Sequence, residues 1–199
     1  SHLLGRGCSV VGIDHNQNAK LNSELQGYLG SSLDLRLGPL DAEALDGIEL
    51  LGISPGVNPK QEAIIAFIRR GGRLFGELEL VGDLPTRCIG ITGTNGKSTT
   101  TTLVGHFLKH LGYRAFVGGN LGVPIIEWVD SKEMADVLVV ELSSFQLETI
   151  ANFEVDVSVV LNIYNDHLDR YESIDDYAST KKKLIDHTSL TGLAVLNAN

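Results

Sequence analysis

The stretch Arg87-Cys-Ile-Gly-Ile-Thr-Gly-Thr-Asn-Gly-Lys-Ser98 decides the fold of this 199-residue chain. Residues 87–92 are apolar enough to predict a strand, and a helix is expected from Lys97 to about residue 111. Between them lies Gly-x-x-Gly-Lys-Ser, the core of a phosphate-binding loop, although Ile91 stands where the strict Walker pattern has its first glycine. This order of strand, loop and helix predicts a P-loop α/β domain that binds a nucleoside triphosphate, most simply ATP with magnesium.

The residue types in the loop suit that ligand. Glycines let backbone N–H groups converge on phosphate oxygens, and a helix N-terminus adds partial positive charge. Lys97 would bridge the terminal phosphates, and the hydroxyl of Ser98 would face Mg²⁺. The predicted nucleotide-binding residues are Gly93, Thr94, Asn95, Gly96, Lys97, Ser98 and Thr99. The alternative is an ordinary glycine-rich turn, which the flanking strand and helix disfavour.

Outward from the loop, short apolar runs alternate with helical patterns, which is typical of parallel sheets with crossover helices. We expect strands at 10–14, 48–53, 73–75, 113–117, 137–141, 157–161 and 193–196, and helices at 17–29, 58–70 and 174–186. The fold class is therefore α/β. Residues 1–76 are predicted to form a partial Rossmann-like parallel-sheet domain, and residues 77–199 a P-loop ATPase-type domain that begins with an acidic connector. The first domain lacks an opening strand and glycine-rich turn, so we expect the chain to be an internal piece of a longer protein.

Composition narrows the class of protein. The chain has 16 Lys and Arg against 25 Asp and Glu, a net charge of −9, which disfavours non-specific nucleic-acid binding. No apolar run is long enough for a membrane span. Cys8 and Cys88 each lie beside an apolar run and are predicted to be buried thiols in a reducing cytoplasm.

A second polar cluster follows the predicted strand 137–141. Glu141 ends this strand, at the edge where α/β proteins bind ligands, so its carboxylate is a candidate ligand for the magnesium of a triphosphate. Ser143 and Gln146 are candidate donors to an anionic substrate. Alternatively, a serine here caps the next helix, and the two roles are compatible.

Three further positions are candidates with open alternatives. His167 follows another strand end among acidic residues, where its spacing fits either a metal-binding role or a structural role. Asn120 lies in Gly118-Gly-Asn-Leu-Gly122, which is either a ligand loop or a plain turn. Lys181 lies in a run of three lysines, and residue type alone does not distinguish it from a solvated basic helix face.

Together these segments resemble the Mur ligase family. The resemblance rests on Gly93–Thr99, Gly118–Gly122, the string Glu141-Leu-Ser-Ser-Phe-Gln-Leu-Glu148 and the string Asp166-His-Leu-Asp-Arg-Tyr171, with the spacing of Tyr177 to Lys181. The phosphate loop is common to Mur ligases and folylpolyglutamate synthases. The two longer strings are more specific to the branch that adds D-glutamate.

The resemblance implies an ATP-dependent ligase of peptidoglycan synthesis that phosphorylates the carboxylate of UDP-N-acetylmuramoyl-L-alanine and joins the acyl phosphate to D-glutamate. It implies a cytoplasmic, monomeric enzyme with a further C-terminal amino-acid-binding domain that this chain lacks, so that the chain alone is expected to be inactive. It assigns two Mg²⁺ sites, with Ser98 and Glu141 at one and His167 at the other, and a carbamylated lysine at Lys181.

By the same resemblance, Lys97, His167 and Lys181 are the catalytic residues. Asn120, Ser143 and Gln146 fall on substrate-contact positions, and Asp14 with Ser54, Pro55 and Gly56 fall where the uridine moiety binds. The alternatives are another Mur-type or folylpolyglutamate-synthase-like ligase, a generic P-loop ATPase or kinase without a lysine carbamate, and a nucleotide-binding module with no activity of its own.

Overall fold

The computed structural model describes residues 2–82 and 84–197 and divides the chain into two compact units. The first consists of residues 1–52 and 59–74, and the second of residues 53–58 and 75–199. The short segment 53–58 thus belongs to the second unit, although the chain returns to the first unit after it, at residues 59–74. Each unit is an α/β structure, as the sequence predicts.

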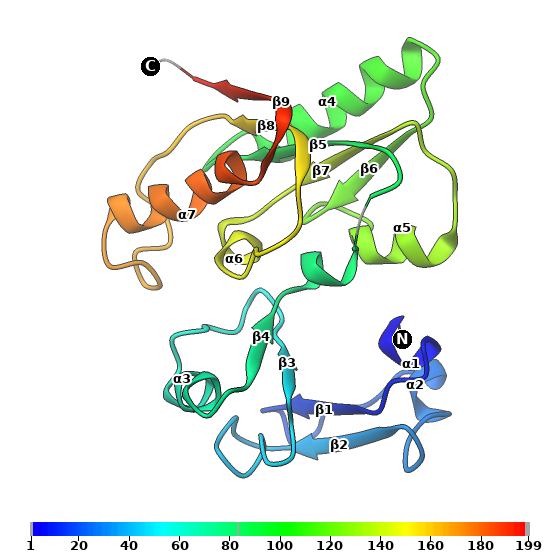
Figure 1. Ribbon diagram of the computed structural model, residues 1–199, viewed down its shortest axis with the longest axis vertical. Helices are drawn as coiled ribbons and strands as arrows, with labels where there is room; N and C mark the ends of the chain where they lie inside the picture. Colours follow the sequence, from blue (N-terminus) through cyan, green and yellow to red (C-terminus); the bar gives the residue numbers. More distant parts are fainter. Residues whose placement is uncertain (1, 83, 198–199) are drawn as a thin grey trace. The chain divides into compact units, whose positions relative to one another are not determined.

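The second unit is built on a five-stranded sheet in the order β6-β7-β5-β8-β9, in which all the strand pairs are parallel. Figure 1 shows its strands side by side. They are β5 (Arg87–Thr92), β6 (Ala115–Gly119), β7 (Val137–Glu141), β8 (Val155–Val160) and β9 (Thr188–Leu196). Because β5 is central, the phosphate loop that follows it lies at the middle of the carboxyl edge, where α/β folds bind ligands.

Helices cover both faces of this sheet. They are α4 (Lys97–His110), α5 (Ile125–Ser131), α6 (Ser144–Glu148) and α7 (Ile174–Asp186), preceded by the 3₁₀ turn η1 (Glu77–Leu80). Successive residues of strand β7 pack on opposite faces of the sheet. Leu138 and Val140 pack into the cluster that contains Trp128 of α5 and Leu184 of α7, whereas Val137 and Val139 pack into a second cluster, against which residues of α4 lie.

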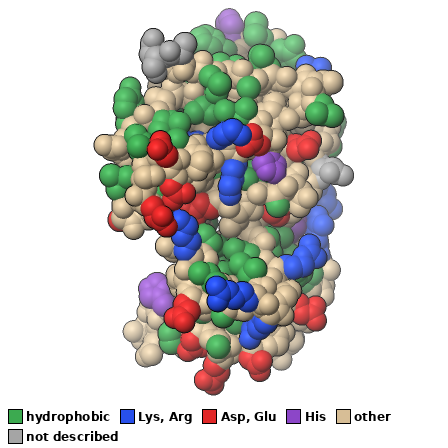
Figure 2. All heavy atoms as spheres, turned by 60° about the vertical axis from the view of Figure 1, so that its left-hand side comes forward, with side chains coloured by type: hydrophobic (Ala, Val, Ile, Leu, Met, Phe, Trp, Pro, Cys, Tyr) green, Lys and Arg blue, Asp and Glu red, His purple; other side chains and the backbone are tan. Residues whose placement is uncertain are grey.

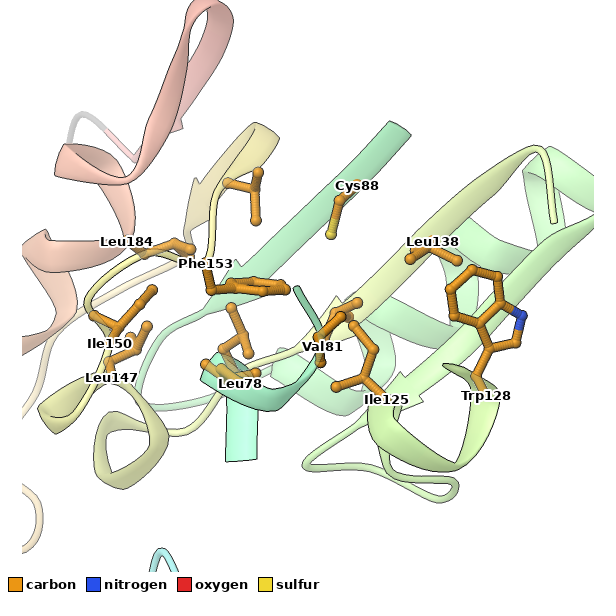
Figure 3. Close-up of a cluster of buried hydrophobic side chains, with 13 residues drawn as sticks. Leu78, Val81, Cys88, Ile125, Trp128, Leu138, Leu147, Ile150, Phe153 and Leu184 are labelled. Atoms are coloured by element: carbon orange, nitrogen blue, oxygen red, sulfur yellow. The ribbon is translucent and has the colours of Figure 1, made fainter. Parts of the chain in front are cut away.

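The larger cluster explains why the connector is ordered. Leu78 of η1 and Val81 lie in it beside Phe153, as Figure 3 shows. The carboxylate of Glu79 accepts hydrogen bonds from the backbone N–H groups of Ala151 and Asn152. The stretch predicted as an acidic connector is therefore a packed part of the second unit.

The first unit contains two small two-stranded sheets. In one, β1 (Val10–Asp14) pairs in parallel with β2 (Leu33–Leu37), and in the other β3 (Leu50–Gly52) pairs with β4 (Arg73–Phe75). The helices are α1 (His2–Gly5), α2 (Ser23–Gln26) and α3 (Glu62–Arg69). Ile64 and Phe67 of α3 are buried.

Two sequence predictions are wrong in this unit. The helix expected at 17–29 shrinks to α2, because asparagine side chains bond to nearby backbone: Asn16 accepts from the N–H of Asn18, and Asn22 caps α2 by accepting from that of Leu25. Cys8 is exposed, whereas Cys88 in β5 is buried as predicted.

The surface carries mixed charge. On the face shown in Figure 2, basic and acidic side chains are interspersed. No helix in residues 2–82 or 84–197 is long and apolar enough to cross a bilayer.

Candidate functional site

The phosphate loop joins β5 to α4. Gly93 has φ +153° and Gly96 has φ +83°, backbone conformations that favour glycine. Gly96 precedes α4 and provides no side-chain cap, so the start of this 14-residue helix is open to an anion. Asn162, which follows β8, supports the loop: its carbonyl accepts from the N–H of Thr94 at 3.0 Å, and its side chain bonds to the backbone of Asn95.

Two lysines meet at one carbonyl of the loop. Lys97 Nζ donates to the carbonyl oxygens of Gly93 at 3.0 Å and Thr94 at 2.9 Å. Lys181 Nζ, from α7, donates to the same Gly93 oxygen at 3.0 Å and to Thr92 Oγ1 at 3.4 Å. The two amines are therefore no farther apart than twice 3.0 Å, and this part of the site concentrates positive charge in an acidic protein.

The environment of Lys181 is unusual for a lysine. Its side chain is 1% exposed and its Nζ lies 4.5 Å from the centre of the Tyr177 ring. Burial and, to a lesser extent, the charge of Lys97 lower the pKa of Lys181 to about 8, against an opposing effect of Asp166. About a tenth of the Lys181 amine is therefore neutral at pH 7, far more than for an exposed lysine.

The neighbouring lysines differ from Lys181 in a way that the sequence does not reveal. Lys182 forms an exposed ion pair with Asp186, and Lys183 donates to the carbonyl oxygen of Glu148. Of the three, Lys181 is the one that reaches the phosphate loop.

Glu141 lies next to the loop in the sheet. It ends β7, where it pairs in register with Ile91 of β5 and Gly119 of β6. Its side chain is 2% exposed: Oε1 accepts from Asn120 Nδ2 at 2.7 Å, while the buried Oε2 has no hydrogen-bond partner among the described residues. A buried carboxylate oxygen without a donor is suited to a cation.

His167 lies in an exposed, strained position. Its φ is +53°, which is uncommon for a residue other than glycine, and its Nε2 is 3.6 Å from Asp166 Oδ2. The ring packs against Phe145 at 4.8 Å between centroids, and the Tyr177 ring is 6.3 Å away. Tyr177 in turn contacts Thr94 of the phosphate loop through its hydroxyl, at 3.3 Å. His167 thus belongs to an aromatic group that extends to the loop.

The described residues form no group of three or more His, Cys, Asp or Glu side chains that could hold a metal. A site that keeps several waters and shares its cation with a bound triphosphate needs fewer protein ligands than this. Glu141 and His167 are therefore compatible with magnesium that enters with the nucleotide.

Ser143 and Gln146 form a capping box at the start of α6. Ser143 Oγ accepts from the N–H of Gln146 at 3.2 Å, and Gln146 Oε1 accepts from the N–H of Ser143 at 3.0 Å. The prediction that a serine caps this helix is therefore confirmed. Contact of Ser143 and Gln146 with a substrate stays a prediction.

The residues expected at the uridine moiety fall in different units. Asp14 ends β1 in the first unit, where its Oδ1 accepts from the N–H of Asn16 at 2.8 Å. Ser54, Pro55 and Gly56 lie in the second unit, in a turn closed by a bond from the N–H of Val57 to the carbonyl of Ser54 at 2.9 Å.

Comparisons with known proteins agree with this architecture. Residues 91–199 match the family described as Mur ligase middle domain. Among curated relatives, the UDP-N-acetylmuramoylalanine–D-glutamate ligase of Pelotomaculum thermopropionicum is 39% identical over 198 residues, which cover 99% of this chain and 44% of the relative. The enzyme of the same name from Anaeromyxobacter dehalogenans is 47% identical, over 96% of this chain and 42% of the relative. The chain thus spans less than half the length of these relatives.

Solved structures show the same fold. A UDP-N-acetylmuramate:L-alanyl-γ-D-glutamyl-meso-diaminopimelate ligase from Neisseria meningitides matches 99% of this chain and 66% of its own, with a TM-score of 0.55 and 18% identity. A MurF ligase from Thermotoga maritima, solved in complex with ADP, matches 79% of this chain and 44% of its own, with a TM-score of 0.50 and 20% identity. From the family match over residues 91–199, this chain belongs to the Mur ligase family.

Proposed function

We propose that residues 1–199 carry the nucleotide-binding part of an ATP-dependent ligase that joins D-glutamate to UDP-N-acetylmuramoyl-L-alanine during peptidoglycan synthesis. The observation that carries the proposal is the meeting of Lys97 and the buried Lys181 at the Gly93 carbonyl. On the neighbouring strand, Glu141 adds an oxygen that has no hydrogen-bond partner among the described residues. The curated relatives that bear this name support the choice of D-glutamate over other amino acids.

The loop suits the ATP that the reaction would consume. A triphosphate that enters the loop would draw Lys97 away from the Gly93 and Thr94 carbonyls, because phosphate oxygens are stronger acceptors for an ammonium group. Backbone N–H groups at the start of α4 would face the phosphates, and Ser98 and Thr99 occupy the first turn of that helix.

The residues present also fit magnesium. Ser98 and Glu141 would hold the ion that accompanies ATP, and His167 would serve a second. The ions would supply charge neutralisation, so that two anions, the triphosphate and the substrate carboxylate, can approach one another.

We propose that Lys181 is carbamylated. Its neutral amine would attack CO₂, forming a nitrogen–carbon bond and releasing one proton, and the product would be an anionic oxygen ligand in place of a cation. The lowered pKa of Lys181 supports this step, because the neutral amine is the reactive form. A generic ATPase or kinase would have no need of it.

The remaining candidates would bind the other substrate. Asn120, Ser143 and Gln146 would contact the UDP-linked acid near its reacting carboxylate. Asp14 would contact the uridine moiety, which makes the first unit a partial UDP-binding domain. The Ser54-Pro55-Gly56 turn of the second unit is a further candidate contact for uridine. From the family resemblance we also propose a cytoplasmic location and a monomer.

The test is a phosphate-release assay on the full-length protein that contains this chain, with ATP, magnesium, UDP-N-acetylmuramoyl-L-alanine and each candidate amino acid in turn. The proposal predicts phosphate release with D-glutamate. Release with another amino acid and none with D-glutamate would contradict it. Residues 1–199 alone are expected to bind nucleotide without turnover.

A further inference from the structure

The side chain of Arg170 makes four hydrogen bonds in the second unit, two of them to Glu148. Its Nε donates to Glu148 Oε1 at 2.9 Å and its Nη2 to Glu148 Oε2 at 2.5 Å, a two-pronged pair whose side chains are 10% and 11% exposed. The guanidinium also lies 4.3 Å from the centre of the Phe145 ring. The Glu148 carboxylate and the Phe145 ring together restrict its movement.

The remaining donors of the same guanidinium reach a distant part of the chain. Nη2 donates to the carbonyl of Val57 at 2.9 Å and Nη1 to that of Gly56 at 3.3 Å, more than 110 residues away in sequence. The backbone N–H of Arg170 donates to the carbonyl of His167 at 2.9 Å. One residue therefore connects the turn at 54–57, helix α6 and the His167 segment.

These three segments carry three sets of candidate site residues: Ser54–Gly56 in the turn, Ser143 and Gln146 in the capping box of α6, and His167. We propose that Arg170, held by Glu148, is a positioning residue that fixes the Gly56–Val57 backbone relative to α6 and thereby sets the place of the UDP-linked substrate. Arg170 itself need not touch the substrate. The inference rests on the proposed function, because that function supplies the substrate.

The shape of the side chain matters in this role. An arginine presents several N–H donors in a fixed plane, so it can hold a carboxylate with two bonds and still donate to two carbonyls. A lysine keeps the charge but has a single nitrogen and cannot make all four contacts at once. The substitution Arg170→Lys therefore tests geometry separately from charge.

The experiment compares the full-length wild-type protein with Arg170→Lys and Glu148→Gln, measuring by calorimetry the Kd for UDP-N-acetylmuramoyl-L-alanine and the Kd for Mg·ATP. Arg114→Lys is the matched control, since Arg114 makes a similar two-pronged pair with Asp136 at the exposed start of β6. The thermal midpoint of each variant reports folding.

We expect Arg170→Lys to weaken binding of the UDP substrate about tenfold, which is the effect of losing hydrogen bonds made by a charged group, with ATP affinity within twofold of wild type. Glu148→Gln should also weaken binding of the UDP substrate, but by less than tenfold. Arg114→Lys should leave the Kd for the UDP substrate and the Kd for Mg·ATP unchanged. Unchanged affinity for the UDP substrate in Arg170→Lys would overturn the inference, as would an equal loss for ATP, which indicates general destabilisation. If the wild-type protein fails to bind the UDP substrate, the proposed function itself is wrong, and the inference with it.

Discussion

Lys181 offers a prediction that can be worked out from the structure. Its pKa is about 8, against an ordinary value of 10.5, because burial and the charge of Lys97 disfavour the ammonium form. In the unfolded chain this lysine titrates near the ordinary value. Between pH 8 and pH 10.5 this lysine therefore carries more protons in the unfolded state than in the folded state, and its contribution to the stability of the fold rises with pH across this window.

The size of the effect follows from the two pKa values. Their difference corresponds to about 3 kcal/mol, at roughly 1.4 kcal/mol for each tenfold change in proton affinity. The contribution is complete above pH 10.5 and is lost as pH falls to 8. Burial raises the pKa of the adjacent Tyr177 hydroxyl, so this group acts in the opposite direction, but it is present in wild type and variant alike and cancels in the difference between them.

The assay is urea unfolding of wild type and Lys181→Met at pH 7.5, 9 and 10.5, in buffers free of CO₂ so that no carbamate forms. The free energy of unfolding of wild type, minus that of the variant, should increase by about 3 kcal/mol from the lowest to the highest pH. Lys182→Met, at the exposed neighbour, should show no such trend. A flat difference for Lys181→Met, or one that falls with pH, would refute the description of Lys181 as a buried amine beside Lys97.

Three other changes have expected outcomes. Lys97→Ala should leave the thermal midpoint nearly unchanged but weaken Mg·ATP binding at least tenfold by calorimetry, and unchanged binding would argue against the phosphate-loop assignment. Gly119→Ala should destabilise the fold by about 2 kcal/mol or more in urea unfolding, because φ is +100° and the new Cβ would lie 2.4 Å from the carbonyl oxygen of Glu141. Gly122→Ala, with φ +67° and open space around the Cβ, should cost about half as much, and equal costs would show that the close approach has no effect. Ser143→Ala should cost about 1 kcal/mol as the N-cap of α6 is lost, and a cost below about 0.3 kcal/mol would mean that the capping box adds no stability.

The sequence predicts the centre of the fold well. Strands 73–75, 87–92 and 137–141 and helix 174–186 have the bounds that were predicted, because each is an uninterrupted apolar or amphipathic pattern. The buried strand β7 is apolar on both faces, which is the pattern of a central parallel strand.

The elements that were missed are short and have weak patterns. Strand β2 has the sequence Leu-Asp-Leu-Arg-Leu at 33–37, an alternation that indicates a half-buried strand and could have been recognised. Helix α5, of seven residues, and helix α6, of five, are too short to show a clear period, and packing rather than propensity stabilises them.

The candidate site also has a part that the sequence predicts and a part that it does not. The loop at 93–98 could be predicted from local spacing, since all its residues are adjacent in sequence. The pairs Lys181 with Gly93, Asn162 with Asn95, and Arg170 with Glu148 join residues 22 to 88 positions apart. No local pattern shows which of three successive lysines faces the loop, because that depends on how α7 packs on the sheet.

The central claim is that the loop and Glu141 together bind a triphosphate with its magnesium, and titration calorimetry tests it most directly. ATP is titrated into the full-length wild-type protein and into Glu141→Gln, once with magnesium and once with a chelator. The account predicts that magnesium strengthens ATP binding to wild type at least tenfold and has little effect on the variant, which retains the bond to Asn120 but lacks the anionic ligand. Equal strengthening by magnesium in both proteins would contradict it.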